Sequence, residues 1–467
     1  MRLRPLLALA SVLLPLSVLP SSLPSATAAT PPPGAISKGV TFVTNVPEMT
    51  TAISVNFIGD TMFVSAMTGI YAYSVKDPAA PTLLGALPMY IWENEDVDVD
   101  PARGLLFISR DPRGFTTQAT PGVFPYGAIQ VIDVSLPHAM TQISLTPIPA
   151  GHTTTCVNGC DYTWTGGPAN AVNGPADWKG RPIYGTDMRN PAMPVACPTP
   201  IDLGRNDGVT DYAHDVQVDP RGIAWVSGRG GVRGYWTSGK HKDPVDGKVK
   251  EATGCAPVPY AGGGTALGKT SGLMHNSWRN PSLKVDGRRG DVLAVTEENL
   301  ASSCEQSGRF ATYDLRNSYS GAGFKASTIK SHRLRELDTW TPEEQEGATG
   351  CDSAHYFTDR GDGLVAIAFY GQGTRFLDIR NPKDIKQVGF FRPDDASTWA
   401  AYWRPGGYVY VADNARGIDV LKIGALSNTA VTAPARDVPA PLNLPDATLG
   451  WMCAVPREVA AHHPSLV

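Results

Sequence analysis

The sequence predicts an all-β fold, a seven-bladed β-propeller with four-stranded antiparallel blades, and three observations support this prediction. Strand-like segments alternate apolar and polar residues with a period of two. The 467-residue chain contains 48 glycines and 40 prolines, which supply tight turns between these segments. The phrases "EDVDVDP", from Glu95, and "HDVQVDP", from His214, belong to one unit that recurs along the chain.

Each predicted unit contains a strand, a tight turn, a second strand, a loop, a third strand, an Asp-Pro or Asn-Pro turn, and a fourth strand. The strings "VIDVSLP", "FLDIRNP" and "GIDVLKI" mark third strands and their turns. Repeated four-stranded antiparallel units of this kind close radially into a propeller. The seven units are expected to begin near Thr51, Glu95, His152, His214, His275, His355 and Trp399.

Several units exceed the roughly 40–45 residues of a usual propeller blade. Gly- and Pro-rich insertions, such as Gly166 to Arg181 and Lys240 to Gly272, account for the surplus. We expect these insertions to lie on one face of the propeller and to form its binding surface.

The propeller is expected to span residues 39–424. Its last unit ends at "GIDVLKIG" without a clear fourth strand, whereas "GVTFVTNVP", residues 39–47, resembles the fourth strands of other units. This N-terminal segment is therefore predicted to close the last blade as its outer strand, which removes an open sheet edge. Residues 425–467 form an Ala- and Pro-rich tail, expected to be mobile or to lie over the surface.

Residues 1–28 have the pattern of a secretory signal peptide. Arg2 and Arg4 precede an apolar run from Leu6 to Leu19, and Ala26-Thr27-Ala28 offers a cleavage pattern of small residues. A membrane helix needs about 20 apolar residues, and no later segment provides them. The sequence therefore predicts a secreted protein with no membrane span. A formal net charge of −4 also argues against a nucleic-acid partner.

The seven cysteines suit an exported protein, because an oxidising compartment permits disulfides. Cys156 and Cys160 flank a "VNG" turn and could close a hairpin. The expectation for the others is that Cys197, Cys255, Cys304 and Cys351 pair among themselves, with Cys304–Cys351 preferred, and that Cys453 stays unpaired.

With its strings "VIDVSLP", "FLDIRNP" and "GIDVLKI", the chain resembles the LVIVD-repeat proteins. The similarity covers about residues 39–424. It implies a secreted or envelope β-propeller, and it implies no reaction, because that family has no agreed activity.

Four of the nine histidines fall at one repeat-equivalent position, the start of the first strand of a unit. The first strand of a propeller blade lines the central channel, so its first residue lies near one channel mouth. The position is taken by His152, His214, His275 and His355, by Glu95 and Trp399 in two further units, and in the first unit by small residues near Thr51 and Ser54. These side chains are predicted to converge on the axis.

Converging imidazoles beside a carboxylate suit a divalent transition metal such as Zn, Cu, Fe or Ni. Glu95 or Asp96 could offset the charge of the ion or orient a histidine ring. Two alternatives remain open. The histidines could be structural residues that bond to backbone along the channel rim, or they could line a metal-free pocket with Glu95, Asp96 and Trp399.

The function favoured by the sequence is that of a secreted scaffold that binds a protein or a small molecule on its loop face. No catalytic constellation is complete. Glu297 and Glu298 could act as an acid–base pair, but a solvated loop is the favoured interpretation. The alternative is a metal-dependent, oxidase-like enzyme that uses the axial histidines.

Overall fold

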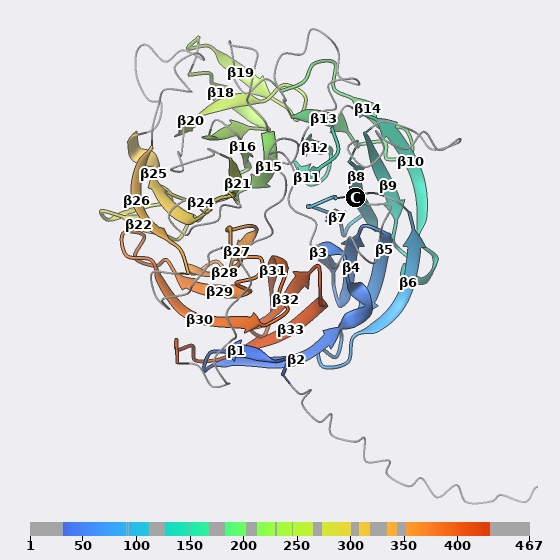
Figure 1. The fold of residues 1–467 in the computed structure, drawn as a ribbon. Coiled ribbons are helices and arrows are strands. Elements are labelled where there is room, and N and C mark those ends of the chain that lie inside the picture. The colour runs from blue at the N-terminus through green and yellow to red at the C-terminus, as the bar shows by residue number, and fades with distance from the viewer. Residues whose placement is uncertain are drawn as a thin grey trace, which may run out of the picture.

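A computed structural model of the chain shows seven β-sheets arranged radially around a central axis (Figure 1). The structure describes residues 31–89, 91, 93–111, 127–148, 150–167, 183–201, 213–228, 231–244, 246–264, 273–299, 308–317, 334–342 and 352–429. The predicted signal peptide, most of the C-terminal tail, and parts of several connections lie outside these residues. In the described part of the chain, no helix has the length and apolar character needed to cross a bilayer.

The first four blades follow the chain order from the axis outward. Blade 1 contains β3 (Ala52–Ile58), β4 (Thr61–Ala66), β5 (Gly69–Ser74) and β6 (Thr82–Pro88). Blade 2 contains β7 (Asp98–Asp100), β8 (Leu105–Arg110), β9 (Ala128–Asp133) and β10 (Thr141–Pro147). Blade 3 contains β11 (Thr153–Val157), β12 (Tyr162–Gly166), β13 (Tyr184–Asp187) and β14 (Val195–Ala196). Blade 4 contains β15 (Ala213–Val218), β16 (Ile223–Gly228), β17 (Gly231–Trp236) and β20 (Val258–Gly264).

The last three blades complete the ring. Blade 5 contains β21 (Met274–Arg279), β24 (Val292–Glu297), β25 (Phe310–Asp314) and β26 (Arg335–Trp340). Blade 6 contains β27 (Phe357–Asp359), β28 (Leu364–Ala368), β29 (Thr374–Asp378) and β30 (Lys386–Pro393). Blade 7 contains β31 (Thr398–Arg404), β32 (Tyr408–Asp413) and β33 (Gly417–Ile423). Small additional elements are β18 (Gly239–Lys242), β19 (Val249–Ala252), β22 (Lys284–Val285), β23 (Arg288–Arg289), and the 3-10 turns Pro47–Met49, Pro137–Ala139 and Leu315–Asn317.

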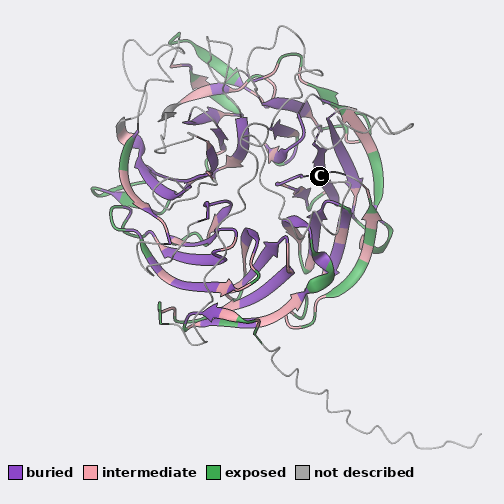
Figure 2. Ribbon diagram, in the orientation of Figure 1, coloured by how far each residue is buried: buried purple, intermediate pink, exposed green. Residues whose placement is uncertain are grey.

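The hydrophobic core lies between adjacent blades. Phe63 of blade 1 packs in one cluster with Leu106 of blade 2, and Trp225 of blade 4 packs in another with Leu293 of blade 5. Buried residues fill the inner strands, and exposed residues concentrate on the outer strands (Figure 2). Each blade buries both faces of its inner strands against its two neighbours. Every blade therefore has both faces covered only when the ring is complete.

The N-terminal segment closes the ring as predicted. Strand β2 (Val40–Val46) pairs antiparallel with β33 and forms the outer strand of blade 7. Strand β1 (Gly34–Ile36) was not predicted; it pairs with β30 and extends blade 6 to five strands. The first residues of the tail also bond to this region, since the amide of Lys38 donates to the carbonyl of Thr429 at 2.7 Å.

Residues 168–181 of the first predicted insertion and 265–272 of the second lie outside the described residues, so the expectation that both share one face stays a prediction. Strand β12 ends on the side where β11 begins, since Gly166 pairs with Thr153. The β18–β19 hairpin follows Trp236, which pairs with Ile223 at the other end of blade 4. In addition, the fourth strand of that blade, β20, lies within the segment Lys240 to Gly272 that the sequence pattern treats as an insertion. The true insertion is therefore shorter than predicted.

Two disulfides lie in the described residues, and both fit the expected pairings. Cys156–Cys160 closes the hairpin between β11 and β12, and Cys197–Cys255 joins the outer edge of blade 3 to the segment before β20 of blade 4. Cys304, Cys351 and Cys453 lie outside the described residues. Paired cysteines are typical of proteins that fold in an oxidising compartment.

Replacing both Cys197 and Cys255 by Ser should destabilise the protein more than replacing Cys156 and Cys160. The first disulfide spans 58 residues of sequence and the second spans 4. The loop-entropy model gives about 4 kcal/mol for the long loop and about 2 kcal/mol for the short one. Denaturant midpoints of the two double variants measure the difference, and equal midpoints would contradict it.

Candidate metal centre at the propeller axis

Seven residues, one from each blade, take equivalent places at or just before the start of the first strand, and we call them the ring residues. They are Ile53, Glu95, His152, His214, His275, His355 and Trp399, and each is at most 1% exposed. The structure thus brings the four predicted histidines together with Glu95 and Trp399. Repeat-equivalent residues converge in this way because the first strand of every blade lines the channel.

A β-bulge at the start of the first strand aims several of these side chains. In blade 4 the register shifts between Ala213 and Asp215, so His214 is the extra residue of the bulge. The same shift occurs around His275 in blade 5. Such a bulge bends the strand and redirects the side chain of the extra residue.

Blade 1 has its bulge between Ala52 and Ser54, which makes Ile53 its ring residue. The sequence interpretation assigned only small residues near Thr51 and Ser54 to this position, and that assignment is wrong. A bulge displaces the regular alternation by one residue, so counting from the strand pattern misses the apolar Ile53.

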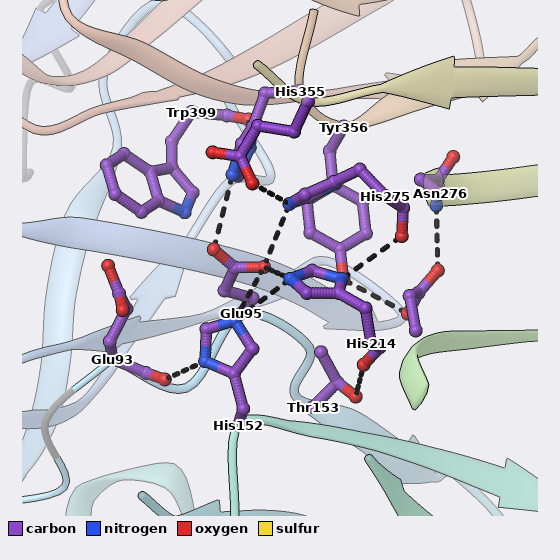
Figure 3. A network of polar contacts seen from close by, with 12 residues as sticks. Glu93, Glu95, His152, Thr153, His214, His275, Asn276, His355, Tyr356 and Trp399 are labelled. Carbon is purple, nitrogen blue, oxygen red and sulfur yellow. Dashed lines mark hydrogen bonds and ion pairs between the residues drawn. The ribbon is translucent and has the colours of Figure 1, made fainter. Parts of the chain in front are cut away.

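The Glu95 carboxylate lies at the centre of the four imidazoles (Figure 3). Its Oε2 atom is 3.3 Å from the Nε2 atoms of both His152 and His214, and 3.2 Å from Nε2 of His275. Its Oε1 atom is 3.2 Å from Nε2 of His355. All four histidines therefore present the same ring nitrogen to one carboxylate.

The opposite nitrogen of three histidines faces a backbone carbonyl. Nδ1 lies 3.0 Å from the Glu93 carbonyl for His152, 3.1 Å from the His275 carbonyl for His214, and 2.6 Å from the Trp399 carbonyl for His355. A carbonyl only accepts hydrogen bonds, so each Nδ1 carries the proton. In a neutral ring, the Nε2 atom then directs its lone pair at the centre of the cluster.

Asp111 adds a carboxylate behind one histidine. Its Oδ2 atom lies 3.2 Å from Nδ1 of His152, and both side chains are buried. Asp111, Glu93 and His152 offer ligand-type atoms within 4.8 Å of one another. Carboxylate and carbonyl partners on the outer nitrogen are the usual surroundings of metal-binding histidines, because they fix the tautomer and the ring orientation.

The electrostatics of the cluster favour the neutral form of two of the four imidazoles. Burial, together with nearby His275, lowers the pKa of His214 well below its ordinary value, and burial likewise lowers the pKa of His275. Burial alone would raise the pKa of Glu95, but His152, His355 and His275 lower that pKa well below its usual range. Although burial lowers the pKa of His355, Glu95 raises it above its ordinary value.

Asp96 lies beside the ring rather than in it. It accepts a hydrogen bond from the hydroxyl of Thr155 at 3.1 Å. Burial, together with Asp215, raises the pKa of Asp96 well above its ordinary value. Asp215 in turn accepts hydrogen bonds from the Tyr356 hydroxyl and from the Asn276 amide, each at 3.0 Å. These residues follow the ring residues in sequence and form a polar layer next to them in the channel.

Trp399 contributes its backbone and its ring. Its carbonyl accepts the Nδ1 proton of His355, and its indole packs edge-on against that imidazole with ring centroids 4.8 Å apart. Tyr370 packs against the same imidazole at 5.0 Å. Trp399 therefore orients His355 and supplies an apolar wall.

Glu297 and Glu298 are buried, so the expectation that they belong to a solvated loop is wrong. The Oε2 atom of Glu298 is 3.8 Å from Nε2 of His275. Its Oε1 atom accepts a hydrogen bond from the Tyr370 hydroxyl at 2.6 Å. Glu298 follows β24, so it reaches the cluster from the end of a second strand, and the repeat register of the first strands gives no signal for it.

Comparison with known proteins adds information about the fold alone. No protein-family model and no curated protein matches the chain. The β-propeller domain of Cps50 (Swd1) from Myceliophteria thermophila aligns with 82% of this chain and 99% of its own, with a TM-score of 0.51 and 9% identity. The shared feature is the propeller fold.

Two other solved structures align less well. The periplasmic gluconolactonase PpgL of Pseudomonas aeruginosa has a TM-score of 0.47 and 13% identity, and covers 82% of this chain and 99% of its own. The WD40 β-propeller domain of Doa1 has a TM-score of 0.48 and 9% identity, and covers 84% of this chain and 97% of its own. The site therefore has to be interpreted from its own chemistry.

Proposed function

We propose that this protein is a secreted, metal-binding β-propeller of the LVIVD-repeat type, in which the four axial histidines and Glu95 hold a divalent transition metal. One observation carries the proposal. The Nε2 atoms of His152 and His214 are only 3.0 Å apart, and both rings carry their proton on Nδ1. Two lone pairs that face each other and a carboxylate repel unless a proton or a metal ion lies between them.

The donor set supports this proposal. Neutral imidazole nitrogens with one carboxylate suit Zn, Cu, Fe or Ni. Three of the four rings are held from behind by a carbonyl, and His152 is also held by Asp111. A purely structural histidine needs a partner for one nitrogen; it does not need three further imidazoles directed at the same point.

A propeller fold supports a binding role, and we propose a small molecule as the ligand of the axial centre. The seven ring side chains are at most 1% exposed, so the surface of a protein partner could not reach them. Protein partners would instead contact the outer loops, which are the usual recognition elements of a rigid scaffold. The metal would anchor a ligand that offers a donor atom of its own.

Metal-dependent oxidation is the second candidate function. The observation that favours it is the 3.0 Å separation of the His152 and His214 nitrogens. At metal–nitrogen distances of about 2.1 Å, ligands at right angles lie about 3.0 Å apart, whereas tetrahedral ligands lie about 3.4 Å apart. Right-angle geometry favours redox-active iron or copper over tetrahedral zinc.

Elemental analysis of the protein tests the metal proposal. Protein purified without chelators, or reloaded with Zn, Cu or Fe after chelation, should retain at least one equivalent of metal through gel filtration. The His214→Ala variant should retain clearly less metal than the native chain, because it loses a central donor. A matched His138→Ala variant, which changes an exposed histidine away from the axis, should bind like the native chain. Native protein that retains no metal under any of these conditions would leave the metal-free pocket as the better interpretation.

A further inference from the structure

We infer that the axial centre binds two divalent ions bridged by the Glu95 carboxylate, an inference that rests on the proposed metal-binding function. The donor atoms form two overlapping triads rather than a single group of five. Glu95, His152 and His214 place their ligand atoms within 4.8 Å of one another, and Glu95, His275 and His355 do the same. Glu95 is common to both triads.

The two oxygens of Glu95 face different histidines. Oε2 lies 3.2–3.3 Å from the Nε2 atoms of three histidines, His152, His214 and His275, whereas Oε1 lies 3.2 Å from Nε2 of His355. A carboxylate with one oxygen toward each of two ligand groups can bridge ions that lie about 3.5–4 Å apart. His275, whose Nε2 is 3.2 Å from Oε2, completes the second triad with His355.

Each triad has the composition of a complete ion site by itself. Two imidazoles and one carboxylate oxygen form the donor set that non-haem iron(II) centres use, with further coordination positions left open for a ligand. The first triad also has the separation expected for ligands at right angles, since its two Nε2 atoms are 3.0 Å apart and the expected value is about 3.0 Å.

Glu298 provides a second carboxylate on the side of His275. Its Oε2 atom is 3.8 Å from Nε2 of that histidine, and His214, His275 and Glu298 form a further group of ligand atoms within 4.8 Å. The Tyr370 hydroxyl donates to Oε1 at 2.6 Å, which leaves Oε2 directed at the imidazole. Glu298 thus adds a carboxylate to the second ion position, on the side of His275.

The backbone of Tyr370 is strained in a way that holds this hydroxyl in place. Its φ of 41° lies in the left-handed region, which bulky residues rarely adopt. Reciprocal backbone bonds with Thr398, at 3.1 Å and 3.0 Å, maintain the conformation. Strain of this kind persists where the surrounding structure fixes a residue, and it is concentrated at functional sites.

Buried carboxylates also surround the imidazoles, namely Glu93, Glu95, Asp111 and Glu298. Carboxylates that are removed from water need compensating positive charge, which bound cations supply.

Equilibrium dialysis of the chelator-treated native chain against Co²⁺ tests the inference. We expect two equivalents of Co²⁺ per chain. Because a shared carboxylate couples the two ions magnetically, the EPR intensity at two equivalents should fall below twice the intensity at one. A single equivalent, or two equivalents with additive EPR signals, would overturn the bridged pair and leave the metal-binding proposal intact. No bound Co²⁺ would overturn both.

Single-histidine variants separate the two positions. His152→Ala and His355→Ala should each retain about one equivalent, because each leaves the other triad complete, and His138→Ala should retain two. Circular dichroism shows whether each variant is folded. Loss of both equivalents from both folded variants would contradict the assignment of the two histidine pairs to separate ions.

Discussion

Deletion of residues 31–46 should prevent the protein from forming a stable propeller, with little soluble protein and no cooperative thermal unfolding. The deletion removes β1 and β2, and with them the buried side chains of Val40, Phe42 and Val46. Burial of each such side chain contributes about 1.5–3 kcal/mol, and a whole domain is stable by only about 5–15 kcal/mol. The open edges of β30 and β33 would also be free to pair with other chains.

Point variants within β2 keep this prediction testable if the deleted chain cannot be purified. Phe42→Ala should lower the free energy of unfolding by about 3–5 kcal/mol, because the ring packs in the core and stacks on Phe391. Thr41→Ala on the exposed side of the same strand is the matched control and should change it by less than about 0.5 kcal/mol. A deleted chain that keeps the native melting temperature would show that the strand does not close the ring.

Much of the fold could be predicted because a propeller repeats one pattern. Alternation with period two and Gly- or Asp-containing turns specify four-stranded units, and the unpaired last unit indicates where the N-terminal strand belongs. Strand β1 could not be predicted, since three residues carry no periodic signal. Strand β20 was misinterpreted for a related reason: the sequence between Val258 and Gly264 ends in three glycines, which also characterise a loop.

The candidate centre was predictable in part because its ligands share one repeat position. Register alone places the four histidines, Glu95 and Trp399 on the axis. Ile53 was missed because a bulge shifts the alternation in blade 1. Asp111 and Glu298 were not predicted as parts of the centre, because both follow second strands. Asp111 reaches His152, and Glu298 reaches His275, only because of the way the blades are rotated about the axis. Such tertiary geometry has no signal in strand periodicity.

Each metal ion that binds should stabilise the protein by about 4 kcal/mol when free metal exceeds its dissociation constant about a thousandfold. An ion that binds only the folded chain adds stability in proportion to the logarithm of its concentration. The unfolded chain cannot form the site, because the four histidines lie far apart in sequence and meet only when the blades close. Urea unfolding in the presence of Co²⁺ or of a chelator measures the increment as a shift in midpoint at constant slope.

The stability that added metal contributes distinguishes metal binding by the histidines from their role in packing. The absolute free energy of unfolding does not. His214→Ala destabilises the metal-free chain because a buried side chain is lost, whatever its function. If His214 is a ligand, the variant should also lose a large part of the metal-dependent increment, since its Nε2 atom lies 3.0 Å from that of His152 and 3.3 Å from Oε2 of Glu95. The His138→Ala control should keep the full increment. A full, undiminished increment in the His214→Ala variant would mean that His214 is not a ligand of the stabilising metal.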